Sequence, residues 1–143
     1  FIPYYNTRLG IYKVPVIIYG KDIKPKVYTQ IIQHIDIMPT LLDLINYDND
    51  FYSLGSSAFD STAPHFAVNY INNTFQIIQN DYALEFNGEK SLNLFNFTND
   101  SLLTNNLIDS KINVRTEMEN NLKSFLQVFS RDIRNNSMII KNN

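Results

Sequence analysis

Apolar side chains recur with helical spacing in two segments of the chain. The first segment places them at positions i, i+3, i+4 and i+7: Met38, Leu41, Leu42 and Ile45. This spacing predicts a helix over residues 37–46, extending at most one residue further. Asp36 stands at the N-cap position, where its carboxylate is expected to accept the backbone N–H of Met38. Pro39 suits the first turn, since N–H groups there lack helical partners.

The second helical segment lies near the end of the chain. Its apolar residues have gaps of 4, 3, 1, 3 and 4: Met118, Leu122, Phe125, Leu126, Phe129 and Ile133. The opposite face is polar: Glu119, Lys123, Gln127 and Arg131. Asp109 or Ser110 is the expected cap of this helix, and the chain is expected to fray after Asn135. A helix of this kind would lay its apolar stripe over one face of a sheet.

Between the two helices, residues 66–97 show the patterning of antiparallel strands. Three strands are expected over Phe66–Ile71, Thr74–Gln79 and Tyr82–Phe86, and a fourth around Leu92 and Leu94. Asn87-Gly88 predicts a hairpin with a type I′ turn, because both residue types tolerate positive φ. Asn72-Asn73 and Asn80-Asp81 are expected to form the other two turns. The fold class is therefore α+β, a four-stranded antiparallel meander with a packed C-terminal helix.

A short apolar run precedes the first helix. Val14–Tyr19 is an uninterrupted run of apolar residues followed by Gly20, which predicts a buried strand. Pro15 lies near its start, where a missing N–H is tolerated.

Composition narrows the class of protein. Hydrophobic residues make up 44% and charged residues 18% of 143 residues, which is typical of a folded domain. The net charge is −2 and no basic stripe occurs, which argues against nucleic acid as a partner. The chain has no Cys, hence no disulfide or thiolate, and no apolar run of the roughly 20 residues that span a bilayer. It begins with Phe1 rather than Met, and we expect it to be a piece of a longer protein.

Three groups of residues are candidates for chemistry. His34 and Asp36 are both metal-ligand types, but two residues do not make a site, and Asp36 already has a role as a cap. His65 lies where a polar loop enters a strand, and Ser61 and Asp60 nearby allow a Ser–His–Asp hypothesis without the spacing of a known elbow. A last group is acidic, without the glycine and distant Glu of a calcium loop: Asp43, Asp48 and Asp50.

Four motifs occur in an order that resembles one family. Ile35–Leu44 (IDIMPTLLDL) resembles the D-x-x-P-T-L-L-D-L segment of sulfatases and lipoteichoic-acid-synthase-like phosphoglycerol transferases, within the alkaline phosphatase superfamily. Val14–Tyr19 resembles the V-P-hydrophobic strand upstream of that segment. Asp81–Leu84 falls where the family has a Y-K-Y-I-like strand. Leu94–Asp100, followed by Asn105–Leu107, resembles the sulfatase ending L-Y-D-L-x-x-D-P … N-L.

The resemblance implies a division of the chain into two parts. Residues 1–55 would complete the large α/β catalytic domain, as a strand and a helix that packs on its core sheet. Residues 56–143 would form the C-terminal subdomain, an antiparallel sheet with a closing helix. Because that subdomain can wall the substrate cleft in this superfamily, the resemblance makes His65 the one cleft candidate in this chain.

The resemblance also implies that the catalytic groups lie outside this chain. The family uses a Thr, Ser or formylglycine nucleophile and an Asp-His metal pair just before the V-P strand. No Cys or S-x-P-x-R motif occurs here, and neither histidine follows an Asp. We therefore expect no catalytic, cofactor-binding or metal-binding residue in this chain, and a divalent metal (Ca, Mg, Mn or Zn) in the longer parent.

The expected partners follow from the same resemblance. They are the N-terminal catalytic part of the same polypeptide and, for the parent, a sulfate or phosphate ester. The parent would be periplasmic or otherwise extracytoplasmic, and membrane-anchored. The alternative is a non-catalytic interaction or scaffold module with the same tail architecture.

Overall fold

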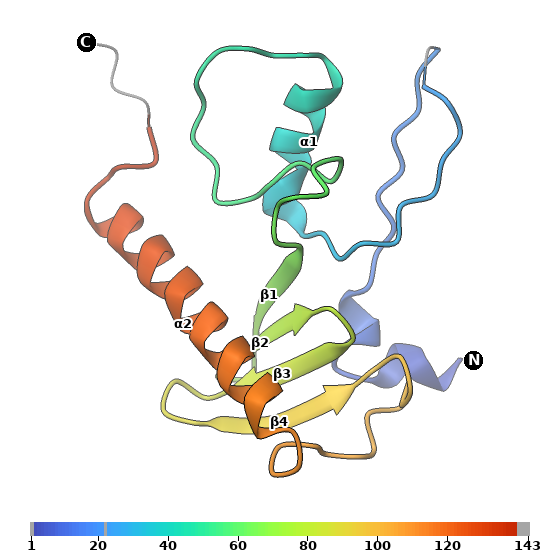
Figure 1. Ribbon diagram of the computed structural model, residues 1–143, viewed down its shortest axis with the longest axis vertical. Helices are drawn as coiled ribbons and strands as arrows, with labels where there is room; N and C mark the ends of the chain where they lie inside the picture. The colour runs from blue at the N-terminus through green and yellow to red at the C-terminus, as the bar shows by residue number, and fades with distance from the viewer. Residues whose placement is uncertain (1, 22, 140–143) are drawn as a thin grey trace.

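The structure, a computed structural model, describes residues 2–21 and 23–139 and has the predicted α+β architecture (Figure 1). Four antiparallel strands form one sheet in the order β1-β2-β3-β4: Phe66–Ile71, Thr74–Gln79, Tyr82–Phe86 and Ser91–Asn96. Helix α2, Ile112–Arg134, lies across one face of the sheet, and the short helix α1, Ile37–Leu44, lies beyond the β1 end of the sheet. Three 3-10 turns complete the elements: η1 Pro3–Asn6, η2 Gly10–Tyr12 and η3 His34–Asp36.

Asparagine residues form the first two hairpin turns, as the sequence predicts. Asn72 and Asn73 both have positive φ, 49° and 59°, and they join β1 to β2 as a two-residue turn of the type I′ kind. Asn80 has a φ of 52° in the turn between β2 and β3. Asparagine tolerates this region because its short polar side chain can hydrogen-bond locally.

The type I′ prediction for Asn87-Gly88 is wrong in detail. Gly88 does have positive φ, 98°, but Asn87 does not, and the loop spans residues 87–90. The Asn87 side chain accepts the backbone N–H groups of Glu89 and Lys90 at 3.0 and 2.9 Å. A type I′ turn would need a second residue with positive φ. Here the Asn87 side chain satisfies the loop N–H groups instead. A bulge between Glu85 and Phe86 accompanies it.

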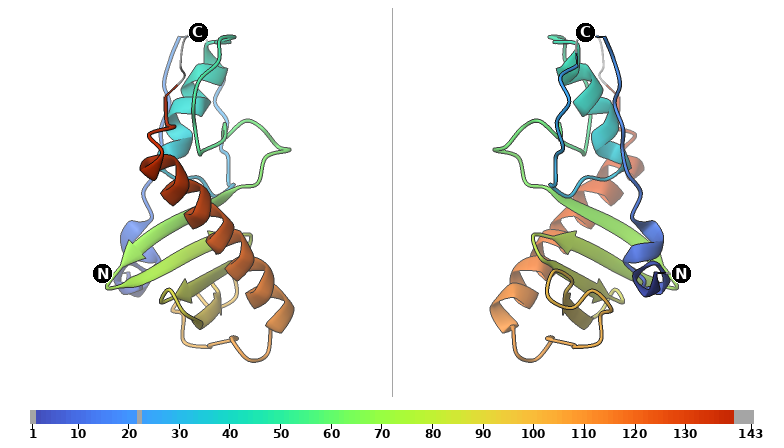
Figure 2. Two further views of the ribbon diagram at one scale, coloured as in Figure 1. Left: turned by 90° about the vertical axis from the view of Figure 1, so that its left-hand side faces the viewer. Right: turned by 90° about the vertical axis from the view of Figure 1, so that its right-hand side faces the viewer.

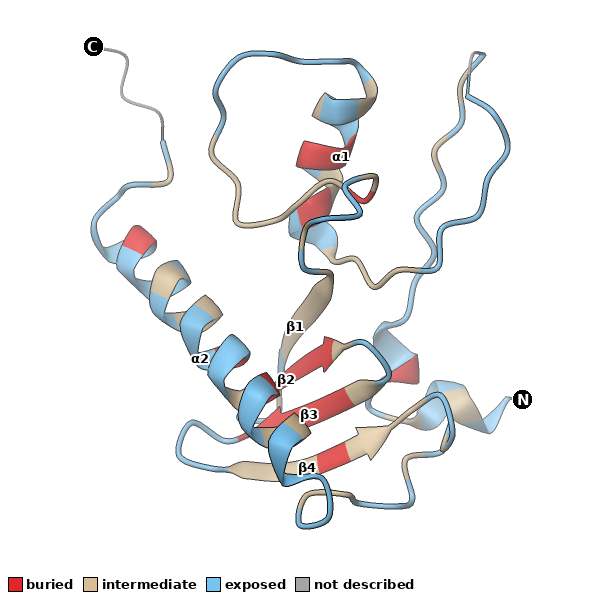
Figure 3. Cartoon of the chain, in the orientation of Figure 1, coloured by how far each residue is buried: buried red, intermediate tan, exposed pale blue. Residues whose placement is uncertain are grey.

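One face of the sheet forms the main core with α2 (Figure 3). Its buried members come from β2, β3, β4 and the first half of the helix: Ile77, Leu84, Phe86, Leu94, Met118 and Leu122. Leu122 is fully buried, whereas Ile133 is 55% exposed. The predicted stripe is therefore correct, and it packs on the sheet from Met118 to Leu126 but not at Ile133.

The predicted cap of α2 is wrong. The N-cap residue is Lys111, and no side chain caps the helix. The Ser110 hydroxyl instead donates to the carbonyl of Leu107. The Leu107 N–H donates to the carbonyl of Leu94 at 2.7 Å, so the connection before α2 is bonded to the edge of β4. The prediction of fraying after Asn135 concerns in part residues 140–143, which lie outside the described residues.

On the opposite face of the sheet lies part of the N-terminal part of the chain, as residues 2–55 are called from here on. Leu9 packs there with Ile78 and Ala83, and Ile31 lies against the same cluster. Figure 2 shows α2 on one side of the sheet and the N-terminal turns on the other. The chain therefore has two small cores, one on each face.

The prediction of a buried strand at Val14–Tyr19 is wrong. The segment is extended but pairs with no strand among the described residues. All its side chains except the half-buried Ile18 are exposed, Ile17 by 84% and Tyr19 by 96%. A strand needs a neighbouring strand for its N–H and C=O groups, and the described sheet consists of β1 to β4 alone.

Helix α1 forms where the sequence predicts it, but its orientation differs from the expectation. The residues that it buries are Pro39 and Thr40. Of the four residues of the predicted stripe, Leu42 is half-buried, and the other three are exposed by 44 to 67%: Met38, Leu41 and Ile45. No helix or strand in the described part of the chain covers these three residues.

The conformation of Gly88 makes a stability prediction. A Cβ at this position would meet no atom within 4 Å, so the cost of a substitution is conformational alone. Gly88→Val should lower the free energy of unfolding by about 1–2 kcal/mol, since β-branched residues avoid positive φ. Gly88→Asn, which tolerates positive φ better, should lose less. Urea unfolding of the two variants checks this, and equal stability of Gly88→Val and the native chain would contradict it.

Candidate functional site

The carboxylate of Asp36 is buried and bonded to two backbone segments. One oxygen accepts the N–H of Gln33 at 2.8 Å, and the other accepts the N–H of Ser56 at 2.9 Å. Asp36 is 6% exposed. It makes no side-chain bond to α1, so the prediction that it caps Met38 is wrong. The carboxylate instead closes turn η3 and holds a loop twenty residues away.

Thr40 and Gly55 complete this arrangement. The Thr40 hydroxyl donates to the carbonyl of Asp36 at 2.6 Å and accepts the N–H of Ala58 at 2.9 Å. A Cβ on Gly55 would overlap the carbonyl oxygen of Ile35 and a carboxylate oxygen of Asp36. Only glycine allows the loop to approach this closely. We call these three residues, Asp36, Thr40 and Gly55, the α1 brace.

The two histidines lie apart and have different surroundings. His34 is exposed in η3. His65 is half-buried before β1, and its Nε2 lies 2.9 Å from the carbonyl oxygen of Asp60. The carboxylate of Asp60 faces Thr62 instead, accepting its N–H at 2.8 Å and its hydroxyl at 2.7 Å. These bonds hold the pKa of Asp60 below its usual value. A Ser–His–Asp relay through Ser61 is therefore not assembled.

The residues described do not fit a metal site. Residues 2–21 and 23–139 contain no group of three His, Cys, Asp or Glu side chains placed to hold an ion. Asp36 uses both oxygens on backbone N–H groups, and Asp43 accepts the hydroxyl of Ser57. The resemblance implies a divalent metal. Side chains that could ligate it do not come together in this part of the chain.

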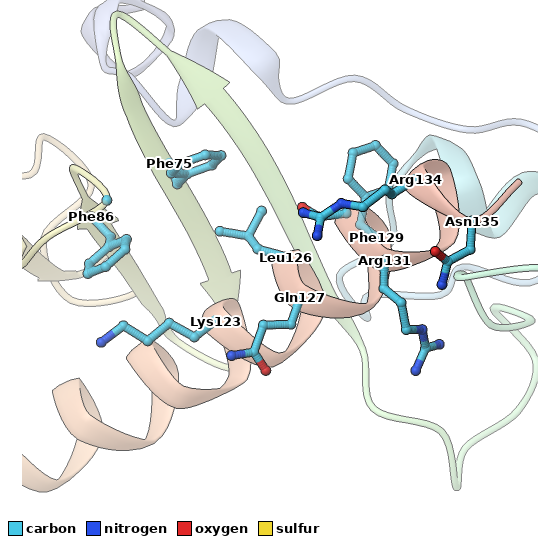
Figure 4. A pocket seen from close by; sticks show the side chains of 11 residues that line it. Phe75, Phe86, Lys123, Leu126, Gln127, Phe129, Arg131, Arg134 and Asn135 are labelled. Atoms are coloured by element: carbon cyan, nitrogen blue, oxygen red, sulfur yellow. The ribbon is translucent and has the colours of Figure 1, made fainter. Parts of the chain in front are cut away.

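A groove of about 680 Å³ lies between the second half of α2 and the β2–β3 end of the sheet (Figure 4). Its walls are apolar, from Phe75, Phe86, Leu126 and Phe129, and its cations are Lys123, Arg131 and Arg134. Lys123 is paired with Glu119, which lowers the pKa of that carboxyl, and Arg131 is paired with Asp132. With two of the three cations paired, the groove is mainly an apolar surface. His65 lines neither this groove nor the second cavity described below.

A buried carboxylate ties the end of α2 to the N-terminal part. Asp132 is 4% exposed. It accepts the Arg131 guanidinium at 2.7 Å and the Tyr52 hydroxyl at 2.6 Å. The guanidinium, and after it the Tyr52 hydroxyl, lower the pKa of Asp132 to about 2, and the same carboxylate raises the pKa of Tyr52. Tyr52 therefore fixes the loop after α1 to a helix eighty residues away.

The N-terminal part also carries a large share of the exposed apolar surface. Strongly exposed apolar side chains come from the extended segment, the segment before α1 and the residue that follows α1: Val14, Ile17, Tyr19, Val27 and Ile45. Single exposed apolar residues are common on proteins, whereas a contiguous apolar patch marks an interaction surface. We call the residues of this set the N-terminal apolar surface.

Comparison with known proteins adds no relative. No protein-family model matches the chain, and no curated protein matches it significantly. Among the described residues, no helix combines the length and the apolar character that crossing a bilayer requires.

The α1 brace predicts a large effect of one substitution. Asp36→Ala removes two buried charge-assisted hydrogen bonds and leaves the N–H groups of Gln33 and Ser56 without partners. It should lower the free energy of unfolding by about 3 kcal/mol, more than the roughly 1 kcal/mol of a lost helix cap. Asp43→Ala, an exposed change on the same helix, should cost less than about 1 kcal/mol. Chemical denaturation of both variants checks this, and equal losses would show that the brace is not the source.

The Asp132 network predicts a pH dependence. The folded pKa is about 2 and the ordinary value is 3.8. Since the folded pKa is the lower one, Asp132 contributes stability above about pH 4, and this contribution disappears as the pH falls towards 2. The melting temperature of Asp132→Asn should lie below that of the native chain at pH 6, and the difference should shrink by pH 2. The control Asp109→Asn should follow the native curve. A constant difference across this range would contradict the assignment.

Proposed function

We propose that this chain is the C-terminal part of a metal-dependent sulfatase or of a related phosphoglycerol transferase. In this proposal residues 1–55 complete an α/β catalytic domain, and residues 56–143 form a subdomain that walls the substrate cleft. The N-terminal catalytic part of the polypeptide supplies the nucleophile and the divalent metal. The parent acts outside the cytoplasm and is anchored to a membrane.

The observation that carries the proposal is that the family-like motif, Ile35–Leu44, lies beside exposed apolar side chains. Within Ile35–Leu44, the Asp and Thr of the D-x-x-P-T pattern are Asp36 and Thr40, and both belong to the α1 brace. Their roles here are structural, which agrees with a segment that positions a helix and holds no metal. Three residues of the apolar stripe are exposed: Met38, Leu41 and Ile45.

The extended segment supports the same proposal. Val14–Tyr19 has the composition of a buried parallel strand but lies unpaired and exposed. A neighbouring strand from a larger sheet would satisfy its backbone and cover Ile17 and Tyr19. The N-terminal apolar surface thus has the chemistry of an interface with further α/β structure.

Activity gives the first test. The chain has none of the motifs from which this family builds its nucleophile and metal pair. The chain alone should therefore hydrolyse neither aryl sulfates nor aryl phosphates with Mg²⁺, Mn²⁺, Ca²⁺ or Zn²⁺ added, whereas the longer protein should do so in a metal-dependent way. Within the longer protein, His65→Ala should lower kcat/KM if the side chain lines the cleft. Metal-dependent turnover by the chain alone, abolished by His34→Ala, would overturn the proposal.

Stability gives the second test. Ile17→Glu should change the free energy of unfolding of this chain by no more than about 0.5 kcal/mol, because the side chain is exposed. In the longer protein the same change should cost at least about 2 kcal/mol, since a charge would be buried without a partner. Ile112→Glu, at the exposed start of α2, should have equal effects in both proteins. No extra loss for Ile17→Glu in the longer protein would favour the scaffold alternative, in which this surface binds a separate partner.

A further inference from the structure

Four polar side chains form a row across the sheet on the face opposite α2. They lie at paired positions of neighbouring strands: Asn69 opposite Gln76, Gln76 opposite Glu85, and Glu85 opposite Asn93. Their neighbours Ile77, Leu84 and Leu94 face α2, so by the alternation of strands the row faces the other way. Gln76 and Glu85 are each only 3% exposed. A buried carboxylate at the centre of a sheet is costly unless it is paired.

Only one oxygen of Glu85 is paired. Oε2 accepts the Arg8 guanidinium at 3.1 Å and the Asn93 amide at 2.7 Å. Oε1 has no partner within hydrogen-bonding distance among the described residues. In the same part of the chain, no fully buried side-chain polar atom lacks a partner. Oε1 is therefore accessible to solvent, and Glu85 is one of the residues that line a cavity.

That cavity has a volume of about 370 Å³ and lies between residues 3–8, strands β3 and β4, and Leu102 and Leu103. This volume is within the range of about 300–1,000 Å³ typical of small-molecule sites. Arg8 lines it, and its side chain is 57% exposed, so its remaining N–H groups are available. Phe95 and Leu103 supply apolar surface in the same cavity. Figure 1 shows the N-terminal turns beside the sheet at this place.

We propose that this cavity binds a small zwitterion with an apolar side chain, the chemistry of a free apolar α-amino acid. The ligand ammonium donates to Glu85 Oε1, its carboxylate accepts from the Arg8 guanidinium, and its side chain lies on Phe95 and Leu103. The opposite charges of Arg8 and Glu85 are adjacent, so a ligand of a single sign gains from one and is repelled by the other. A dipolar ligand is attracted by both. This inference does not depend on the proposed function.

The test is an amide chemical-shift titration of the full chain with L-leucine. We expect saturable shifts at residues 6–8, 85 and 95. Two matched compounds isolate the charges: 4-methylpentanoate lacks the ammonium, and 3-methylbutylamine lacks the carboxylate. Each should bind at least about tenfold more weakly than leucine. Absence of saturable shifts with leucine, or equal binding of either single-charge compound, would overturn the proposal.

Matched variants locate the site. Glu85→Gln should weaken leucine binding at least about tenfold, whereas Glu89→Gln, the same change in the exposed 87–90 loop, should leave the Kd within about twofold. Leu102→Trp is a second variant at a 49% exposed position on the rim, which fills the cavity without disturbing the buried carboxylate. It should abolish the shifts even if Glu85→Gln does not fold. Unchanged binding by Leu102→Trp would place the ligand elsewhere and contradict the inference.

Discussion

The carboxylate of Asp36 is the contact on which the position of helix α1 depends. Helix α1 buries only Pro39 and Thr40, so no apolar core of its own holds it to the sheet. The attachment consists instead of side-chain hydrogen bonds to backbone groups: Asp36 to Gln33 and Ser56, and Thr40 to Ala58. Gln33 extends the chain of bonds by accepting the N–H of Val68 in β1 at 3.1 Å. Such bonds are directional and fix an orientation, whereas apolar contacts mainly supply free energy.

The two faces of the sheet are stabilised by different means. On the α2 face the contacts are apolar, and Ser91 adds one bond to Glu119 that fixes the helix to β4. On the other face a small apolar cluster around Leu9 lies beside the polar row centred on Glu85. A charge at this point lowers the hydrophobic gain and requires Arg8 from a distant part of the chain. The cost is consistent with a role for Glu85 beyond packing.

The elements of the fold were predictable from local sequence because their signals are local. The strand and helix periods, and the Asn72-Asn73 and Asn80-Asp81 turns, can be read within a few residues. The burial of Val14–Tyr19 could not be read in this way, because hydrophobicity indicates a preference for burial but does not supply the neighbouring strand. The role of Asp36 was equally hidden, since its partner Ser56 is twenty residues away. The burial of Glu85 was hidden too, because a charge that alternates with Leu84 and Phe86 is the ordinary pattern of a strand with one solvated face.

The orientation of α1 carries an argument of its own. A surface helix normally turns its apolar stripe inward and its polar side outward. Here the buried side consists of Pro39 and a hydroxyl-bearing Thr40, and the exposed side includes Met38, Leu41 and Ile45. This arrangement forgoes hydrophobic stabilisation, because the apolar area of these side chains stays in contact with water after folding. The brace can hold such a helix, but it does not explain why the stripe is apolar. A second layer of structure on that stripe would explain it, and the proposed function supplies such a layer from the catalytic domain.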